Sequence, residues 1–336
     1  MGKRIEFIDA LKGFAIFCVL WGHSLQDLRN EADFFHNQVF AFIYAFHMPL
    51  FFMISGFFFA SSLKLGYKEF LLKKSKQLLF PSLIWTVFYV LLDLAERIYH
   101  HDTNYMMSLH LLIPSYHPLW FLTELFISYL LVYVCMKIAK KAWVACLLSI
   151  VFVLFAPYCR FQNFLLPFFW IGIYLKRNYQ VIATFSTKIL AIAGVLFVVC
   201  LLFWNGDYTI YQSPLILFKI RTLTYNFSNI DIALFRFFTG MTGSVFWLML
   251  FHKIYQGNRY FSVLSTVGTY TLGIYILQKI ILETLINRML DFSDVNIYIY
   301  NFLITPLMAV FVCAICIVLM KFISKNKFCS LVLLGK

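Results

Sequence analysis

The fold of this chain is decided by its first apolar stretch, Phe7-Ile-Asp-Ala-Leu-Lys-Gly-Phe-Ala-Ile-Phe-Cys-Val-Leu-Trp-Gly-His23-Ser24. It is long and hydrophobic enough to enter a bilayer, yet it carries Asp9, Lys12 and His23. On a helix, Lys12 and His23 lie about 20° apart around the axis and about 16 Å apart along it, and Asp9 lies about 60° from Lys12. Ionisable groups inside a membrane segment are costly and usually face a protein interior or a water-filled path. We therefore expect this polar stripe to form one wall of a site.

The composition is that of a polytopic membrane protein. Of the 336 residues, 62% are hydrophobic and 13% are charged, whereas a soluble domain is about half apolar and about a quarter charged. Apolar runs of about twenty residues recur without strict alternation, which predicts membrane helices rather than an outer-membrane barrel. The net charge of +13 comes mainly from short loops, so it indicates topology and not nucleic acid binding.

We predict an all-α transmembrane bundle of about ten spans, forming a single membrane-embedded domain over residues 1–336 with both termini cytoplasmic. The expected spans are 6–25, 39–62, 78–97, 119–137, 142–158, 161–176, 186–204, 232–251, 264–286 and 298–322. This arrangement places nineteen Lys and Arg residues on the cytoplasmic side and six outside, as the positive-inside rule requires. No connection is long enough for a second catalytic domain, so the bundle itself must carry any chemistry.

The second apolar run contains Phe46-His47-Met-Pro49-Leu-Phe-Phe-Met-Ile-Ser55-Gly56. Pro49 predicts a kink or an early helix turn, with backbone groups that need partners. His47 is a candidate either to bond those groups or to line the same site as His23. Ser55 and Gly56 permit close helix approach, for which simple packing is an equally good explanation.

Two further charges fall inside predicted spans. Glu124 follows the interfacial Trp120, and Arg236 lies in a later run. Because an unpaired charge in a membrane is expensive, we expect the partner of Glu124 among Lys12, Arg236 and the histidines. For Lys12, the nearest counter-charge is Asp9 at i−3.

A cluster of lysines precedes the third span. Lys73, Lys74 and Lys76 stand just before Pro81, and they are either a positive-inside anchor or a cytoplasmic phosphate-binding patch. The eight cysteines lie in apolar segments, and the C-x-x-C pair Cys313 and Cys316 has no partner pair. We therefore expect packing cysteines and no metal site.

Taken in order, these segments resemble the integral-membrane acyltransferase family 3, whose members O-acylate polysaccharides and glycolipids. Asp9-Ala-Leu-Lys12-Gly-Phe-Ala followed by His23 is similar to the family's basic-x10-His signature, and the run from His47 to Gly56 is similar to its second-helix motif. Leu119-Trp-Phe-Leu and Thr271-Leu-Gly-Ile-Tyr resemble its middle and late signatures. The chain shows no SGNH-type esterase domain.

This resemblance implies a membrane-bound O-acyltransferase of the inner (cytoplasmic) membrane, expected to be an O-acetyltransferase. The donor would be acetyl-CoA or another acyl-CoA, and the acceptor a cell-surface polysaccharide or a lipid-linked glycan. His23 would act as general base or carry the acyl group transiently, and Lys12, Lys73, Lys74 and Lys76 would bind the CoA. The residues expected to support the site are Asp9, Lys12, His47, Ser55, Trp120, Glu124 and Arg236.

Three positions depart from the family pattern. Many members have Arg where Lys12 stands, Gln77 replaces a loop arginine, and Gln278 replaces a common His. A transporter or flippase for a lipid-linked sugar accounts for the helices and buried charges equally well, but not for the ordered signatures. Acyl transfer by the purified protein would separate the two classes. The acceptor glycan, the acyl group and the oligomeric state stay open.

Overall fold

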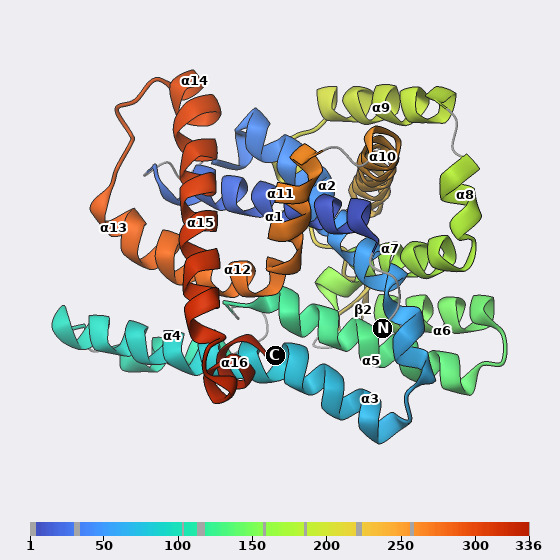
Figure 1. Ribbon diagram of the computed structural model, residues 1–336, viewed down its shortest axis with the longest axis horizontal. Helices are drawn as coiled ribbons and strands as arrows, with labels where there is room; N and C mark the ends of the chain where they lie inside the picture. Colours follow the sequence, from blue (N-terminus) through green and yellow to red (C-terminus); the bar gives the residue numbers. More distant parts are fainter. Residues whose placement is uncertain are drawn as a thin grey trace. The chain divides into compact units, whose positions relative to one another are not determined.

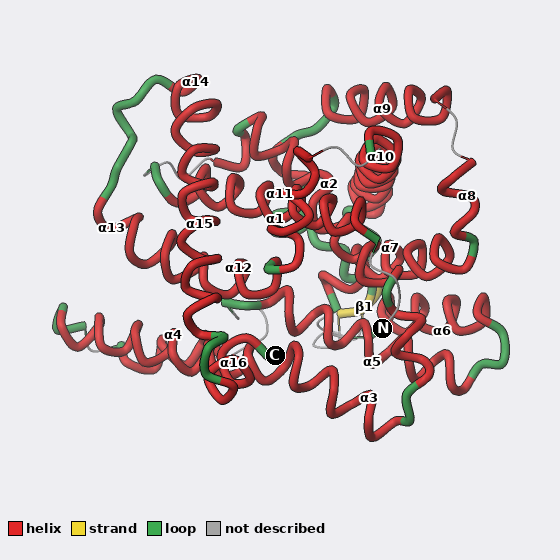
Figure 2. Tube along the Cα trace, in the orientation of Figure 1, coloured by secondary structure: helices red, strands yellow, loops and turns green. Residues whose placement is uncertain are grey.

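The computed structural model describes residues 5–29, 34–102, 104–112, 118–156, 159–184, 187–219, 224–255 and 259–335. Lys3, Arg4, Arg221 and Lys336, which entered the charge comparison, lie outside these ranges. In the described residues the fold is helical, with one two-stranded antiparallel hairpin pairing Phe218 with Tyr225 (Figures 1 and 2). The predicted all-α polytopic fold is confirmed.

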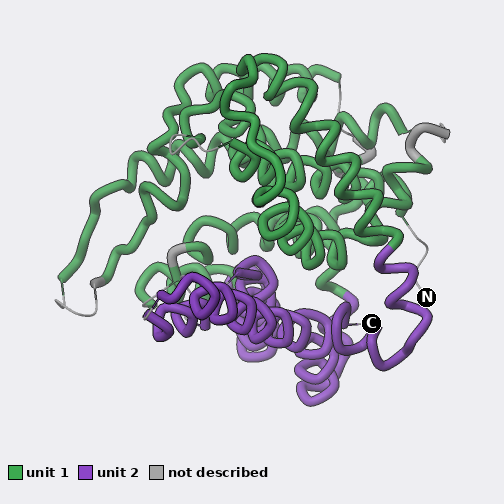
Figure 3. The backbone as a smooth tube through the Cα atoms, turned by 90° about the vertical axis from the view of Figure 1, so that its left-hand side faces the viewer, with its two compact units in different colours: residues 1–60, 146–318 green, residues 61–145, 319–336 purple. Residues whose placement is uncertain are grey.

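The chain divides into two compact units, each described here by itself (Figure 3). Unit 1 comprises residues 1–60 and 146–318, and unit 2 comprises residues 61–145 and 319–336.

The elements of unit 1, some of which run on into unit 2, are α1 (Glu6–Asp27), η1 (Phe34–His36), α2 (Gln38–Phe57), α6 (Ala142–Phe155), α7 (Arg160–Arg177), α8 (Tyr179–Thr184), α9 (Thr187–Leu202), η5 (Gly206–Tyr208), β1 (Phe218–Lys219), β2 (Thr224–Tyr225), α10 (Ile230–Ile254), α11 (Arg259–Thr269), α12 (Thr271–Gln278), η6 (Lys279–Ile286), α13 (Asn287–Met289), α14 (Ile297–Ile299), η7 (Tyr300–Ile304) and α15 (Thr305–Ile323). Those of unit 2 are η2 (Phe59–Lys64), which begins in unit 1, α3 (Tyr67–Lys74), η3 (Ser75–Leu79), α4 (Phe80–Tyr99), η4 (Tyr105–Leu112), α5 (Trp120–Ile138) and α16 (Lys327–Leu334).

Fewer helices than expected are long and apolar enough to span a membrane. Among the described residues there are six, or seven if one bent pair counts as a span. The six are Glu6–Asp27, Gln38–Lys64, Tyr67–Tyr99, Trp120–Ile138, Ile230–Ile254 and Ile297–Ile323. Of the other expected spans, α6 and α9 are shorter apolar helices, and α7 carries charges at both ends. Our count of about ten is therefore not confirmed.

The bent pair corrects the expected span 264–286. The helix ending at Thr269 and the helix beginning at Thr271 meet at 67°. The second of these runs into the π-helix η6, where the backbone winds more widely than in an α-helix. The apolar run is continuous in sequence, so hydropathy could not reveal this change of direction.

Glycine allows α1 and α11 to approach each other closely. A Cβ atom on Gly13 would lie 2.0 Å from the carbonyl oxygen of Leu264, and one on Gly268 would lie 1.8 Å from that of Asp9. These distances are far below van der Waals contact, so only glycine fits at either position. These contacts hold the first half of α1 against α11 within unit 1.

Glycines also allow α2 and α7 to approach each other closely. A Cβ on Gly56 would lie 1.9 Å from the carbonyl oxygen of Phe169, and one on Gly172 would lie 1.9 Å from that of Met53. The prediction of close helix approach at Ser55-Gly56 is confirmed at Gly56. Pro49 lies inside α2, so the alternative of an early helix turn is wrong.

Candidate active site

His23 lies near the end of α1 and faces two carboxylates. Its Nδ1 atom is 3.6 Å from Glu283 Oε1, which comes from η6, and Asp27 lies one helical turn further along α1. The side chains of His23 and Glu283 are about a quarter and a fifth exposed. The facing atoms, His23 Nδ1 and Glu283 Oε1, are buried and make no hydrogen bond within the described part of the chain. The geometry is therefore that of a carboxylate able to orient an imidazole.

Glu283 is held by the helix that carries it. The ammonium group of Lys279 pairs with the other carboxylate oxygen, Glu283 Oε2, four residues along the chain. Because both residues belong to the π-helix η6, their side chains take positions that α-helical periodicity does not give. Lys279, which lies within the expected span 264–286, thus has Glu283 as its counter-ion.

The end of α1 is fixed by hydrogen bonds from η7 and α15. The indole nitrogen of Trp21 donates to the carbonyl of Asn301 at 3.2 Å and to Thr305 Oγ1 at 2.9 Å. The hydroxyl of Tyr300 lies 3.0 Å from the carbonyls of both Ser24 and Leu25. The Ser24 carbonyl also accepts the N–H of Leu28 at 3.3 Å, and the Leu25 carbonyl lies in the last turn of α1, where intrahelical partners run out. His23 is therefore presented by a well-anchored helix end.

His47 lies close to His23 but has a local bond of its own. Its Nδ1–H donates to the carbonyl of Ile43 at 2.7 Å, which leaves Nε2 as the acceptor nitrogen of the neutral ring. The ring of Tyr44 meets it edge-on, with 4.7 Å between centroids. Tyr44 also lies within electrostatic range of Asp27 and Glu283. The carbonyl of Ile43 is four residues before His47 and is not the one that Pro49 frees, so this bond does not match the first alternative. The role of His47 in lining the site with His23 stays a prediction.

Lys12 is paired as the sequence predicts. Its ammonium group is 2.6 Å from Asp9 Oδ1, and the carboxylate side chain is only 10% exposed. The same ammonium lies 5.4 Å from the centre of the Phe58 ring. Lys12 is thus directed toward protein groups, about three turns from His23 on one helix.

Arg236 is buried on α10 and holds a loop. Its Nη1 group donates to the carbonyls of Tyr208 and Ser213, at 3.1 Å each, and its guanidinium lies 5.0 Å from the centre of the Phe164 ring. The expected pairing of Glu124 with Lys12, Arg236 or a histidine stays a prediction, because Glu124 belongs to unit 2. Ser55 is half-buried on α2, next to the Gly56 contact.

The remaining predicted residues belong to unit 2. Trp120 begins α5, and Glu124 is buried on the same helix. Lys73 and Lys76 are exposed, whereas Lys74 is buried with its ammonium 3.7 Å from the centre of the Tyr129 ring. Two lysines of the cluster, Lys73 and Lys76, are therefore exposed, and the third, Lys74, is packed against the Tyr129 ring. The approach of these five residues to His23 stays a prediction.

One group of described residues has the composition of a metal site. His23, Asp27 and Glu283 each offer one ligand atom, and these atoms lie within 4.8 Å of one another. Lys279 already neutralises Glu283, and its positive charge opposes a cation at this place. The expectation of an enzyme without a metal stays a prediction.

Sequence reasoning missed Asp27 and Glu283. A signal for each was present, because Asp27 is four residues after His23 and Glu283 is four residues after Lys279, the spacing at which helical side chains meet. The juxtaposition of the two pairs depends on tertiary packing and on the π-helical turn, which that spacing does not encode.

Comparison with known proteins bears on the chemistry of this site. A family model described as an acyltransferase domain matches residues 5–321. Nodulation protein NolL of Sinorhizobium fredii (strain NBRC 101917 / NGR234) is 29% identical over 224 residues, which are 61% of this chain and 59% of that protein. Nodulation protein NolL of Mesorhizobium japonicum (strain LMG 29417 / CECT 9101 / MAFF 303099) is 28% identical over 218 residues, 61% of this chain and 58% of that protein.

The chain thus matches less than two thirds of the length of these relatives. No solved structure matches it. The family model, in contrast, covers both the Lys12-to-His23 helix and the helix that carries Glu283. The chain therefore belongs to the integral-membrane acyltransferase family 3.

Proposed function

We propose that this protein is a multi-pass inner-membrane O-acyltransferase that moves an acyl group, expected to be acetyl, from cytoplasmic acyl-CoA to a hydroxyl of a cell-surface polysaccharide or lipid-linked glycan. The observation that carries the proposal is the His23–Glu283 pair, which lies within the residues that the acyltransferase family model matches. The glycan acceptor rests on the family resemblance. The whole chain, residues 1–336, would work as one domain without a metal.

The pair has a direct role in this reaction. Glu283 would hold the proton on His23 Nδ1, leaving Nε2 to take the proton from the acceptor hydroxyl. The resulting oxygen nucleophile attacks the thioester carbonyl carbon, the carbon–sulfur bond breaks, and the CoA thiolate takes the proton from the imidazolium. The 3.6 Å separation of Nδ1 and Oε1 exceeds a hydrogen bond, and catalytic contacts of this kind often tighten when substrate binds.

A second course uses His23 as a nucleophile, with the acyl group passing through an acyl-histidine. Rapid quenching of enzyme mixed with labelled acetyl-CoA, without acceptor, separates the two. Label retained on a His23 peptide supports the second course, and its absence supports direct transfer.

Purified protein and radiolabelled acetyl-CoA provide the test of the function. Labelled ester should form on glycan from cells that lack the protein, with release of one CoA for each ester. Cells without the protein should also lose glycan O-acyl groups. Movement of unmodified lipid-linked sugar across vesicles, with no ester formed, would instead identify a carrier.

The exposed lysines should act on the donor. Replacing Lys73 and Lys76 with Gln is expected to raise the KM for acetyl-CoA by about three- to tenfold, since each removes an exposed charge opposite a CoA phosphate. The rise should shrink at high salt, and the KM for the acceptor should not change. Replacing Lys140 and Lys141 with Gln, also exposed in unit 2, is the charge-matched control. An unchanged donor KM would leave the lysine cluster with a topological role only.

Lys12 should affect turnover or donor binding, because we place it on the wall of the donor site about three turns from His23. Lys12→Met is expected to lower kcat/KM for acetyl-CoA by about tenfold or more, whereas Lys12→Arg, which keeps the charge, should retain appreciable activity. Since Lys12→Met also leaves the Asp9 carboxylate unpaired, the double variant Asp9→Asn/Lys12→Met serves as the stability control. Full activity in that double variant would exclude Lys12 from donor binding.

A further inference from the structure

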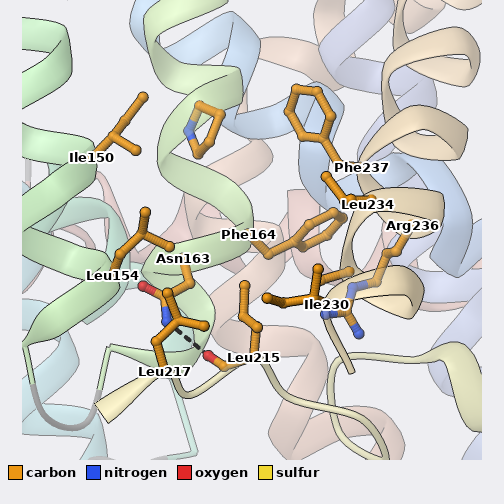
Figure 4. A pocket seen from close by; sticks show the side chains of 12 residues that line it. Ile150, Leu154, Asn163, Phe164, Leu215, Leu217, Ile230, Leu234, Arg236 and Phe237 are labelled. Atoms are coloured by element: carbon orange, nitrogen blue, oxygen red, sulfur yellow. Dashed lines mark hydrogen bonds between the residues drawn. The ribbon is translucent and has the colours of Figure 1, made fainter. Parts of the chain in front are cut away.

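A cavity of about 360 Å³ lies between α6, α7, α10 and the segment before β1 (Figure 4). Its lining includes Arg236 but none of the other residues proposed for acyl transfer. The walls are apolar and include Leu154 of α6, Phe164 of α7 and Phe237 of α10. This volume is at the lower end for ligand pockets, which measure about 300–1,000 Å³, so it suits one slender molecule.

The cavity adjoins an exposed apolar surface of α10. Leu234 lines it and is 65% exposed, and Phe238 beside it on α10 is 47% exposed. The helix α10 is long and apolar enough to span a membrane. Large apolar side chains exposed on such a helix meet lipid hydrocarbon. A hydrocarbon chain from the bilayer is therefore the molecule placed to enter.

Two polar side chains mark one part of this apolar space. Arg236 is 2% exposed, and its Nε–H is buried without a hydrogen-bond partner among the described residues. Asn163 donates from its amide nitrogen to the carbonyl of Leu215 at 2.7 Å, and its Oδ1 is buried and likewise unpartnered. Figure 4 shows both side chains in the lower half of the view, with Leu215 between them. Buried donors and acceptors are rarely left unpaired, so a molecule carrying complementary groups is indicated.

Charge favours an acidic partner. The hydrogen bonds of Arg236 are to the neutral carbonyls of Tyr208 and Ser213. An anionic phosphate would supply both an acceptor for Nε–H and a compensating charge. A hydroxyl on the same head group would donate to Asn163 Oδ1.

We propose that this cavity binds one hydrocarbon chain of an anionic, hydroxyl-bearing phospholipid, whose head group meets Arg236 and Asn163. The inference does not rest on the proposed function, because a lipid bound here need not be a substrate. The proposal has two parts that can be tested separately. The hydrocarbon chain of the lipid must occupy the cavity, and its head group must be acidic.

Photolabelling of the full chain tests both parts. Purified protein is exposed to phosphatidylglycerol carrying a diazirine in one acyl chain, and labelled peptides are mapped by mass spectrometry. Label should concentrate on peptides containing residues 163–167 and 230–237. Phosphatidylcholine with the same labelled chain keeps the phosphate but lacks the head-group hydroxyls and the net negative charge, so it should label these peptides about tenfold less.

Filling the cavity should remove the label. Ala233→Trp, which places a large ring in the lining, is expected to reduce labelling by about tenfold. Val198→Trp, on the exposed face of α9, is the control and should label as the parent does. If Ala233→Trp fails to fold, Leu154→Trp fills the same space from α6. Undiminished label in a folded, filled variant would overturn the cavity assignment, and equal labelling by the two lipids would overturn the head-group assignment.

Discussion

Replacing His23 with alanine is expected to lower acyl transfer by about 10²–10⁴-fold, the usual contribution of a positioned general base. The reason is that the imidazole faces Glu283 at the end of α1, on a helix that the acyltransferase family model covers. A loss of this size in kcat, with little change in the donor KM, would place the effect on the chemical step. Steady-state formation of labelled ester by the purified variant gives the measurement.

The control is a second half-buried histidine of unit 1. His252 lies near the end of α10, where its ring meets Phe7 edge-on at 5.1 Å, and it is not among the residues placed at the site. His252→Ala should keep near-parental activity and a similar thermal midpoint. His23→Ala should elute as the parent does on size exclusion. Near-parental activity in folded His23→Ala would remove this histidine from the mechanism.

The first helix shows how far sequence alone can reach. The rotation of Lys12 and His23 onto one stripe follows from helical geometry, and the pairing of Lys12 with Asp9 follows from i, i+3 spacing. Both depend on a few neighbouring residues, and the pairing is confirmed at 2.6 Å. The close approach at Gly56 was also predictable as a use for a small residue, although its partner, the Phe169 carbonyl, was not.

Arg236 shows where such reasoning stops. A buried cation in a predicted span calls for a partner, and a carboxylate such as Glu124 is the natural candidate. In the structure two backbone carbonyls of the Tyr208–Ser213 loop accept its hydrogen bonds. Carbonyls occur at every residue, so composition cannot reveal which of them a given side chain will meet.

The position of Glu283 could be predicted only in part from the sequence. Its charge inside an apolar run marks it as costly, but the turn on which it lies is π-helical. With about 4.4 residues in each turn for i→i+5 bonding, instead of 3.6, side chains leave the stripe that an α-helical projection assigns. The 67° bend at Tyr270 further redirects the helix that carries Glu283. The pairing with His23 therefore emerges only in three dimensions.

Glu283→Gln is expected to lower kcat by about 10- to 100-fold, which corresponds to losing a charge-assisted hydrogen bond worth about 1.5–3 kcal/mol. Glutamine keeps the size of the side chain but removes the charge that stabilises the imidazolium formed during proton transfer. Because Glu283 acts through His23 and touches no substrate in this mechanism, KM for both substrates should stay within about twofold. Kinetics with acetyl-CoA and glycan varied separately measure this division.

If Glu283 had only a structural role, a different result would be expected, and a variant of Lys279 distinguishes a structural role from positioning of His23. Glu283→Gln leaves the Lys279 ammonium without its counter-ion, so some loss of stability is expected whatever the catalytic role. The double variant Lys279→Met/Glu283→Gln removes both charges and should recover thermal stability. If positioning of His23 is the function, kcat stays low in that double variant, while Glu283→Asp, which keeps a carboxylate, recovers part of it. Recovery of kcat together with stability in the double variant would show that Glu283 serves only to neutralise Lys279.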